Sequence, residues 1–198
     1  MSLAEIEIPQ TPAAQLATEV CRRFQSQSLV NHCMRAYLWS AHYGTANAIA
    51  FDAELLYVSA MLHDLGLVPE FDSHTIDFEI AGGYVAWVFA AGAGWSPARR
   101  NRAAEIVVRH MRSGVEPDVD AEGHLLALST SLDISGAHPE WWPDEFRAEV
   151  VAQYPLLELG REFIACFEDQ AARKPESAAA KSVASGIAGR IENNPLAR

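Results

Sequence analysis

Apolar residues recur at three- and four-residue spacing along nearly the whole chain, and this period constrains its fold more than any other feature. Such spacing places apolar side chains on one face of an α-helix, whereas a half-buried strand would need strict alternation. No hairpin turn signal separates alternating segments in the sequence. The pattern therefore predicts an all-α fold, a helical bundle of about seven to eight helices.

Hydroxyl residues, prolines and glycines mark where these helices begin and end. Thr11-Pro12 and Ser96-Pro97 each form a typical helix start, in which an N-cap is followed by proline at the first helical position. Gly66 is a stop signal for the helix before it. We expect helices from about residue 11, at 28–47, 52–65, 75–93 and 97–110, at 122–135, after Pro143, and at 156–173.

A chain of 198 residues is long enough for one substantial core, and we expect a single domain over residues 11–174. Residues 1–10 are expected to be a flexible N-terminus. After Pro175 the sequence turns to Ala, Ser, Gly and Asn with few large apolar residues. Such a segment buries little surface, which predicts a mobile or loosely helical tail over residues 175–198.

Charge and cysteine content limit the partners of the chain. The 15 basic residues are outnumbered by 26 acidic ones, and a net charge of -11 disfavours nucleic acid as a partner. The three cysteines are widely spaced without a Cys-x-x-Cys pair, which is typical of reduced thiols in the cytoplasm. No uninterrupted apolar run reaches the ~20 residues that span a membrane. We expect a cytoplasmic protein with a small-molecule substrate and no membrane partner; a homo-oligomer is compatible with the sequence.

His63 and Asp64 stand side by side at the end of an apolar run. A carboxylate buried without a partner is costly, so a cation is expected beside it. His32 and Asp133 lie in apolar helical segments too, and one divalent metal bound by His32, His63, Asp64 and Asp133 would account for all four. In the alternative, His63 interacts with a helix dipole and Asp64 is solvated, which leaves the surrounding apolar residues unexplained.

The donor set indicates which metal the site would hold. Two imidazoles and two carboxylates suit a transition metal rather than calcium, with Zn or Fe expected first and Mn, Ni and Co also compatible. Bound water reaches a pKa of about 7 in a favourable zinc site. The sequence thus predicts a metal centre that activates water at neutral pH.

The order His, His-Asp, Asp resembles the HD-domain superfamily of metal-dependent hydrolases and lyases, whose helical fold gathers four such residues around one metal. Within that superfamily the chain is most similar to the cyanamide-hydratase-like group. The similarity extends from about residue 28 to 174 and is carried by Ser28-Leu29-Val30-Asn31-His32-Cys33-Met34-Arg35, Leu62-His63-Asp64-Leu65-Gly66, Ser73-His74, Phe78-Glu79, Gly82-Gly83 and Val108-Arg109-His110.

The resemblance implies that His74, Glu79 and His110 are catalytic and that Arg35 contacts the substrate. His110 is the first candidate for proton transfer, because an imidazole titrates near neutral pH; the alternative is that it interacts with a helix dipole. Glu79 would be a general base or orient a ligand, unless it lies on a solvated face, and His74 has a cap or surface role as its alternative. Arg35 lies one helical turn from His32 and is expected to project into the same cavity.

Three functions are open at this point. The resemblance implies a hydro-lyase that adds metal-activated water to a small nitrile-like substrate, as in the conversion of cyanamide to urea. The alternative is an HD-type phosphohydrolase acting on a nucleotide or another small phosphate ester, with Arg35 pairing the phosphate. A third is a non-catalytic sensor with an HD fold. Apolar and aromatic residues around the expected cavity favour the smaller substrate.

Overall fold

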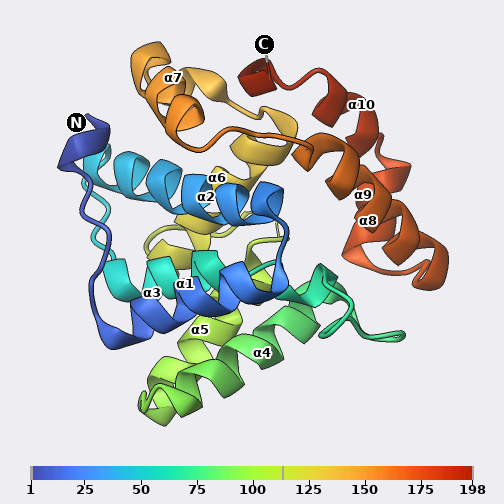
Figure 1. The fold of residues 1–198 in the computed structure, drawn as a ribbon, viewed down its shortest axis with the longest axis horizontal. Coiled ribbons are helices and arrows are strands. Elements are labelled where there is room, and N and C mark those ends of the chain that lie inside the picture. Colours follow the sequence, from blue (N-terminus) through green and yellow to red (C-terminus); the bar gives the residue numbers. More distant parts are fainter. Residues whose placement is uncertain (1, 113, 198) are drawn as a thin grey trace.

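The computed structural model describes residues 2–112 and 114–197, and helices are the regular secondary structure of this part of the chain (Figure 1). It contains ten α-helices and four short 3-10 helices, with no strand among the described residues. The all-α prediction is therefore confirmed. The α-helices are α1 Pro12–Phe24, α2 Gln27–Ala46, α3 Ala53–Leu62, α4 Phe78–Gly92, α5 Pro97–Arg109, α6 Ala121–Ser135, α7 Asp144–Gln153, α8 Leu159–Arg173, α9 Ala178–Ala184 and α10 Ile187–Glu192.

The expected helix starts are present as side-chain caps. The Thr11 hydroxyl accepts a hydrogen bond from the backbone N–H of Ala14, and the Ser96 hydroxyl accepts one from Arg99. The N-caps of α2, α3 and α6 are equivalent hydroxyl or carboxylate caps. Each cap satisfies an N–H group that the first helical turn leaves unpaired, which fixes where the helix begins.

Helix α2 runs through the middle of the bundle, next to α3 and α6 (Figure 1). Every residue from Ser28 to His42 is buried, including three that can carry charge. A helix enclosed on all sides must pair its polar side chains inside the protein. His32 and Arg35 are therefore held by partners on neighbouring helices.

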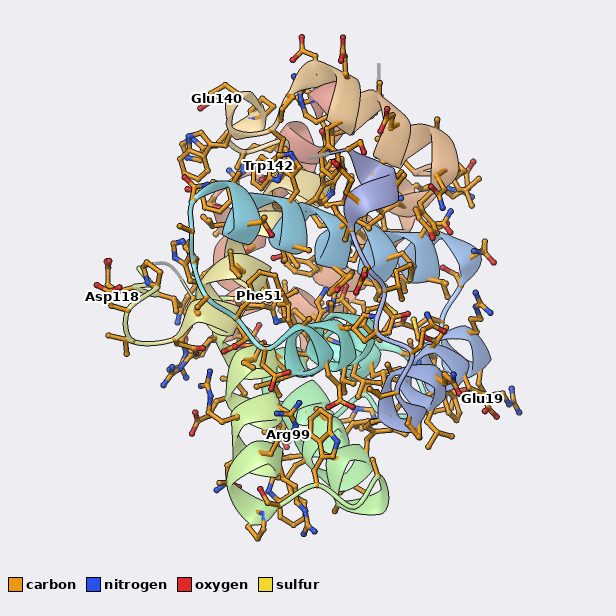
Figure 2. The ribbon with its side chains drawn as sticks, turned by 90° about the vertical axis from the view of Figure 1, so that its left-hand side faces the viewer. Glu19, Phe51, Arg99, Asp118, Glu140 and Trp142 are labelled. Carbon is orange, nitrogen blue, oxygen red and sulfur yellow. The ribbon has the colours of Figure 1, made fainter. Side chains whose placement is uncertain are left out.

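Helices α4 and α5 form an antiparallel pair at one end of the molecule in both views (Figures 1 and 2). The two helices approach closely at Gly83, where a Cβ atom would lie 3.2 Å from the carbonyl oxygen of Ala104. The N-terminal part of α4 also packs against the 3-10 helix Leu65–Leu67, which directly follows the His-Asp pair. Neither α4 nor any other described helix combines the length and apolar character needed to cross a bilayer.

The segment after residue 174 forms two short helices, α9 and α10, where the sequence predicts a mobile or loosely helical tail. Ile191 and Leu196 are buried, and the Asn194 amide donates hydrogen bonds to the backbone carbonyls of Asp133 and Ile134. A few apolar residues and one amide thus hold this segment against α6 and α8. The N-terminal residues are likewise in contact with the bundle, because the Tyr37 hydroxyl donates to the carbonyl of Glu7.

A substitution at Gly66 tests how closely the 3-10 helix Leu65–Leu67 approaches α4. A Cβ atom at this position would collide with the carbonyl oxygen of Phe78 and lie 2.9 Å from the backbone nitrogen of Gly82. Gly66→Ala should lower the free energy of unfolding by about 1–3 kcal/mol, as overpacking typically does. The matched control is Gly92→Ala, whose Cβ would meet nothing within 4 Å. Urea denaturation of both variants gives the comparison, and equal stabilities would contradict the close approach at Gly66.

Candidate metal centre

Three of the four predicted ligands meet in the core. His32 comes from α2, His63 caps the C-terminus of α3, and Asp64 follows it. The Nε2 atoms of His32 and His63 are 3.1 Å apart, and Asp64 Oδ2 lies 3.4 and 3.2 Å from them. All three side chains are at most 1% exposed. These three residues, which we call the HHD cluster, are close enough to share one ion.

Hydrogen bonds at the Nδ1 atoms of His32 and His63 determine which ring nitrogens face each other. His32 Nδ1 lies 2.7 Å from Asp133 Oδ2, and His63 Nδ1 lies 2.8 Å from the carbonyl oxygen of Ala60. Because both partners only accept, each Nδ1 carries a hydrogen, and a neutral ring presents a lone pair at Nε2. Two lone pairs and a carboxylate therefore face one another.

Asp64 shows most directly that the cluster requires a positive charge. Both of its carboxylate oxygens are buried, and neither has a hydrogen-bond partner among the described residues, since the contacts to His32 and His63 lack hydrogen-bond geometry. A buried carboxylate without a partner costs several kcal/mol, and a cation bound in this cluster would offset that cost. A divalent metal fits the donors, since imidazole nitrogen and carboxylate oxygen suit zinc and iron.

His110 brings a third imidazole to the same place. It caps α5, its Nδ1 is bonded to the carbonyl of Val107, and its Nε2 lies 3.9 Å from Asp64 Oδ1. The position of α5 is fixed nearby, where Arg109 pairs with the buried carboxylate of Asp120. His110 thus lies beside the HHD cluster, close enough to Asp64 for us to propose it as a fourth ligand, whereas the sequence predicts a proton-transfer role. An apolar segment precedes both His63 and His110 in the sequence, and this shared pattern is the signal that could have indicated His110 as a ligand.

Asp133 does not join the HHD cluster. Its Oδ1 accepts from Arg35 Nε at 2.8 Å and Trp39 Nε1 at 2.9 Å, while Oδ2 accepts from Arg35 Nη2 at 2.6 Å and from His32 Nδ1. Four hydrogen bonds occupy the acceptor capacity of this carboxylate. In this structure Asp133 thus lies outside the group of possible ligands and fixes the orientation and tautomer of His32 from behind, so its predicted metal binding stays a prediction.

Arg35 does not point into a cavity either. Its side chain is fully buried, and besides Asp133 it donates to the carbonyl oxygens of Tyr154 and Pro155, at 2.8 and 3.2 Å. A guanidinium in a dry core requires such partners, and Asp133 supplies the opposite charge. The predicted substrate contact of Arg35 is thus replaced by a role in positioning Asp133.

The remaining predicted site residues lie outside the cluster. His74 is exposed in the loop between α3 and α4. Glu79 is buried, and burial raises the pKa of its carboxyl group, but it does not line the cavity beside the HHD cluster. Neither residue contacts the candidate ligands, so the structure does not bring them into the site.

Without a metal, the cluster holds a proton in place of the cation. Burial alone would lower the pKa of His32, but its contacts with Asp133 and Asp64 outweigh this and raise the pKa to about 9. The pKa of Asp64 lies well below its ordinary value, because the attraction of His63 and His32 overcomes the effect of burial. Burial lowers the pKa of His110 to about 3. At neutral pH the His110 ring is therefore uncharged and keeps a lone pair on Nε2, while the His32 ring carries the proton.

A cavity of about 280 Å³ connects the HHD cluster with the surface. Phe163 and Phe167 of α8 form one wall and Thr130 of α6 another. Arg112 follows α5 and Arg190 belongs to α10; both line the cavity and both are exposed, which places them toward its mouth. No sequence signal indicated Arg190, because its segment is predicted as a tail.

Comparison with known proteins does not identify this site. No protein-family model matches the chain, and no curated protein matches it. The assignment of a metal centre therefore rests on the geometry of the chain itself.

The different positions of Asp64 and Asp133 predict different consequences of losing their charge. Asp133→Asn should weaken metal binding about 10- to 100-fold, because it disturbs only the orientation of His32. Asp64→Ala removes a donor and should abolish measurable binding. Competition with a chromophoric chelator measures both affinities, with circular dichroism as the check on folding. A larger loss of affinity in Asp133→Asn than in Asp64→Ala would contradict the assignment.

The raised pKa of His32 predicts how metal binding depends on pH. The ring must lose a proton before its Nε2 can bind an ion, so affinity should rise with pH up to about 9, by at most about tenfold per unit. The metal-free protein should show the opposite trend. The stabilising contribution of the proton is complete below pH 6.5 and is lost as the pH rises through about 9. Chelator competition and thermal melting between pH 6 and 9 test both trends, and a flat affinity profile would contradict them.

Proposed function

We propose that this chain is a metal-dependent enzyme of the HD type that adds water to a small substrate. The observation that carries the proposal is Asp64, a buried carboxylate with both oxygens unpaired among the described residues, beside imidazole nitrogens next to a cavity. A divalent metal bound there would act as a Lewis acid and lower the pKa of water toward neutrality. A carboxylate with only a structural role would have hydrogen-bond donors, as Asp133 does.

The residues of the chain would hold and orient this centre. Asp133 and the Ala60 carbonyl fix the rings of His32 and His63, so that neither ring must reorient when an ion binds. Phe163 and Phe167 form an apolar wall next to the cluster. This wall limits the number of water molecules that reach the substrate, which strengthens the electrostatic interactions within the site.

The first candidate reaction is hydration of a nitrile-like molecule, the type that converts cyanamide to urea. The resemblance to the cyanamide-hydratase-like group implies it, and the hydroxyl groups of the cavity support it. Thr130, Ser131 and Ser135 each donate their hydrogen to a backbone carbonyl one turn earlier in α6. Their lone pairs are left to accept from a substrate, which suits one that carries N–H groups.

The second candidate is hydrolysis of a small phosphate ester, and a specific observation favours it. Arg112 and Arg190 approach the cavity from separate elements, and guanidinium groups bind phosphate through charge-assisted hydrogen bonds. These two arginines would bind the substrate phosphate, the role that the sequence analysis assigns to Arg35. The cavity of about 280 Å³ is near the lower end of the range for small-molecule sites. A small phosphate ester would fit it more readily than a large nucleotide.

A paired assay separates the two reactions. Protein purified without chelator and loaded with Zn or Fe is given cyanamide and small nitriles, with urea or amide as the readout, and phosphate esters, with released phosphate as the readout. The double variant Arg112→Gln/Arg190→Gln should lower kcat/KM for a phosphate ester about ten- to a hundredfold, and leave cyanamide hydration unchanged. Asp64→Ala should abolish either activity.

The outcomes of this assay are distinct. Urea formation that survives the arginine changes supports the hydro-lyase, and phosphate release that collapses with them supports the phosphohydrolase. Full metal occupancy with no turnover of any substrate in the panel would contradict the enzymatic proposal. That result would favour the non-catalytic sensor.

A further inference from the structure

The outer face of α4 is exposed, apolar and uncharged. Glu79 is the sole charged residue of this helix in the sequence, and it is buried. Tyr84 is 61% exposed, Trp87 37% and Val88 66%. These three residues, which we call the α4 stripe, have the i, i+3, i+4 spacing that places them on one face. A helix that is apolar all round is normally buried on all sides, so the α4 stripe lacks the cover that its composition implies.

The α4 stripe differs from the other exposed apolar side chains. Among the described residues the remaining large ones lie singly on separate elements: Leu16, Ile76, Val119, Trp141 and Leu157. Single exposed apolar residues are ordinary on a protein surface, whereas a contiguous group indicates an interaction site. The α4 stripe is the place where three of them adjoin.

Charge identifies the kind of partner that fits this end of the molecule. Residues 78–112 contain five arginines and two glutamates. Three of these arginines pair with Asp52, Glu54, Asp120 and Glu122. The five arginines, the two glutamates and the four acidic partners together carry a net charge of -1. The rest of the chain therefore carries -10 of the total net charge of -11. Two copies of this chain therefore repel each other least at this end of the molecule.

A groove beside the α4 stripe provides a surface for side chains from another copy. It lies between α4 and α5, holds about 240 Å³, and is lined by Gly83, Tyr84 and Val108 among others. A two-fold symmetric interface must be complementary to itself, so that it carries both protruding side chains and the hollow that receives them. The α4 stripe and this groove meet that condition on adjacent surfaces.

We propose that the α4 stripe and the adjacent groove form a two-fold symmetric dimer interface, in which α4 packs against α4 of a second copy of this chain. Arg112 lines both this groove and the cavity of the metal centre. The interface therefore reaches the mouth of the cavity, and a second copy contacts the surface around Arg112.

Sedimentation equilibrium of the full-length, metal-loaded protein tests the proposal. The wild type should be dimeric at micromolar concentration, and Val88→Glu should be monomeric, because it would bury two carboxylates against each other at the two-fold axis. The matched control is Leu16→Glu on α1, which replaces another exposed apolar residue and should remain dimeric. A monomeric wild type, or equal dimer content in both variants, would overturn the proposal.

A cross-linking experiment tests the interface independently of any effect of Val88→Glu on folding. Val88→Cys, made together with Cys166→Ser to remove the one partly exposed cysteine, should give a covalent dimer under mild oxidation. Leu16→Cys in the same background should stay monomeric under denaturing conditions. Absence of a cross-link in the Val88→Cys protein would count against the interface. A monomeric wild type that sediments with lipid vesicles would assign the α4 stripe to a membrane surface instead.

Discussion

A buried carboxylate surrounded by lone pairs requires a positive charge, and the centre of this structure is built around that requirement. Asp64 and the Nε2 atoms of His32 and His63 lie within 3.4 Å of one another, and His110 adds another imidazole nearby. Each imidazole is oriented by an acceptor at its other nitrogen. These acceptors come from α6, α3 and α5. The positions of the helices and the direction of the lone pairs are thus parts of one arrangement.

The arrangement depends on a second buried charge pair. Asp133 and Arg35 satisfy each other, and Trp39 and two backbone carbonyls complete their hydrogen bonds. Such a buried pair contributes little net stability, because desolvation offsets its attraction, whereas removing one partner is costly. Its contribution here is geometric, since a fixed Asp133 permits one tautomer and one ring orientation of His32. The loop after α7 takes part through the carbonyls of Tyr154 and Pro155.

The sequence predicted the helices well because their signals are local. N-caps such as Thr11 and Ser96 and the stop signal at Gly66 act within a few residues, and the apolar setting of His32, His63 and Asp64 was visible along the chain. The partners of Arg35 and Asp133 could not be predicted in the same way. They are 98 residues apart, and helical periodicity gives the face of a residue but not what lies across the interface. The packing of residues 175–198 could not be predicted for a related reason, since Asn194 is held by backbone atoms of α6 that no local pattern indicates.

X-ray absorption spectroscopy of the zinc-loaded protein tests the metal centre most directly, because it reports the number and kind of ligand atoms. We expect imidazole scattering from three histidines at about 2.0–2.1 Å together with oxygen from one carboxylate. Replacement of His110 by Ala should lower the imidazole contribution, and replacement of Asp133 by Asn should leave the set of ligand atoms unchanged. A spectrum with two imidazoles that loses an oxygen ligand in Asp133→Asn would contradict this ligand set. It would return Asp133 to the metal ligands that the sequence predicts.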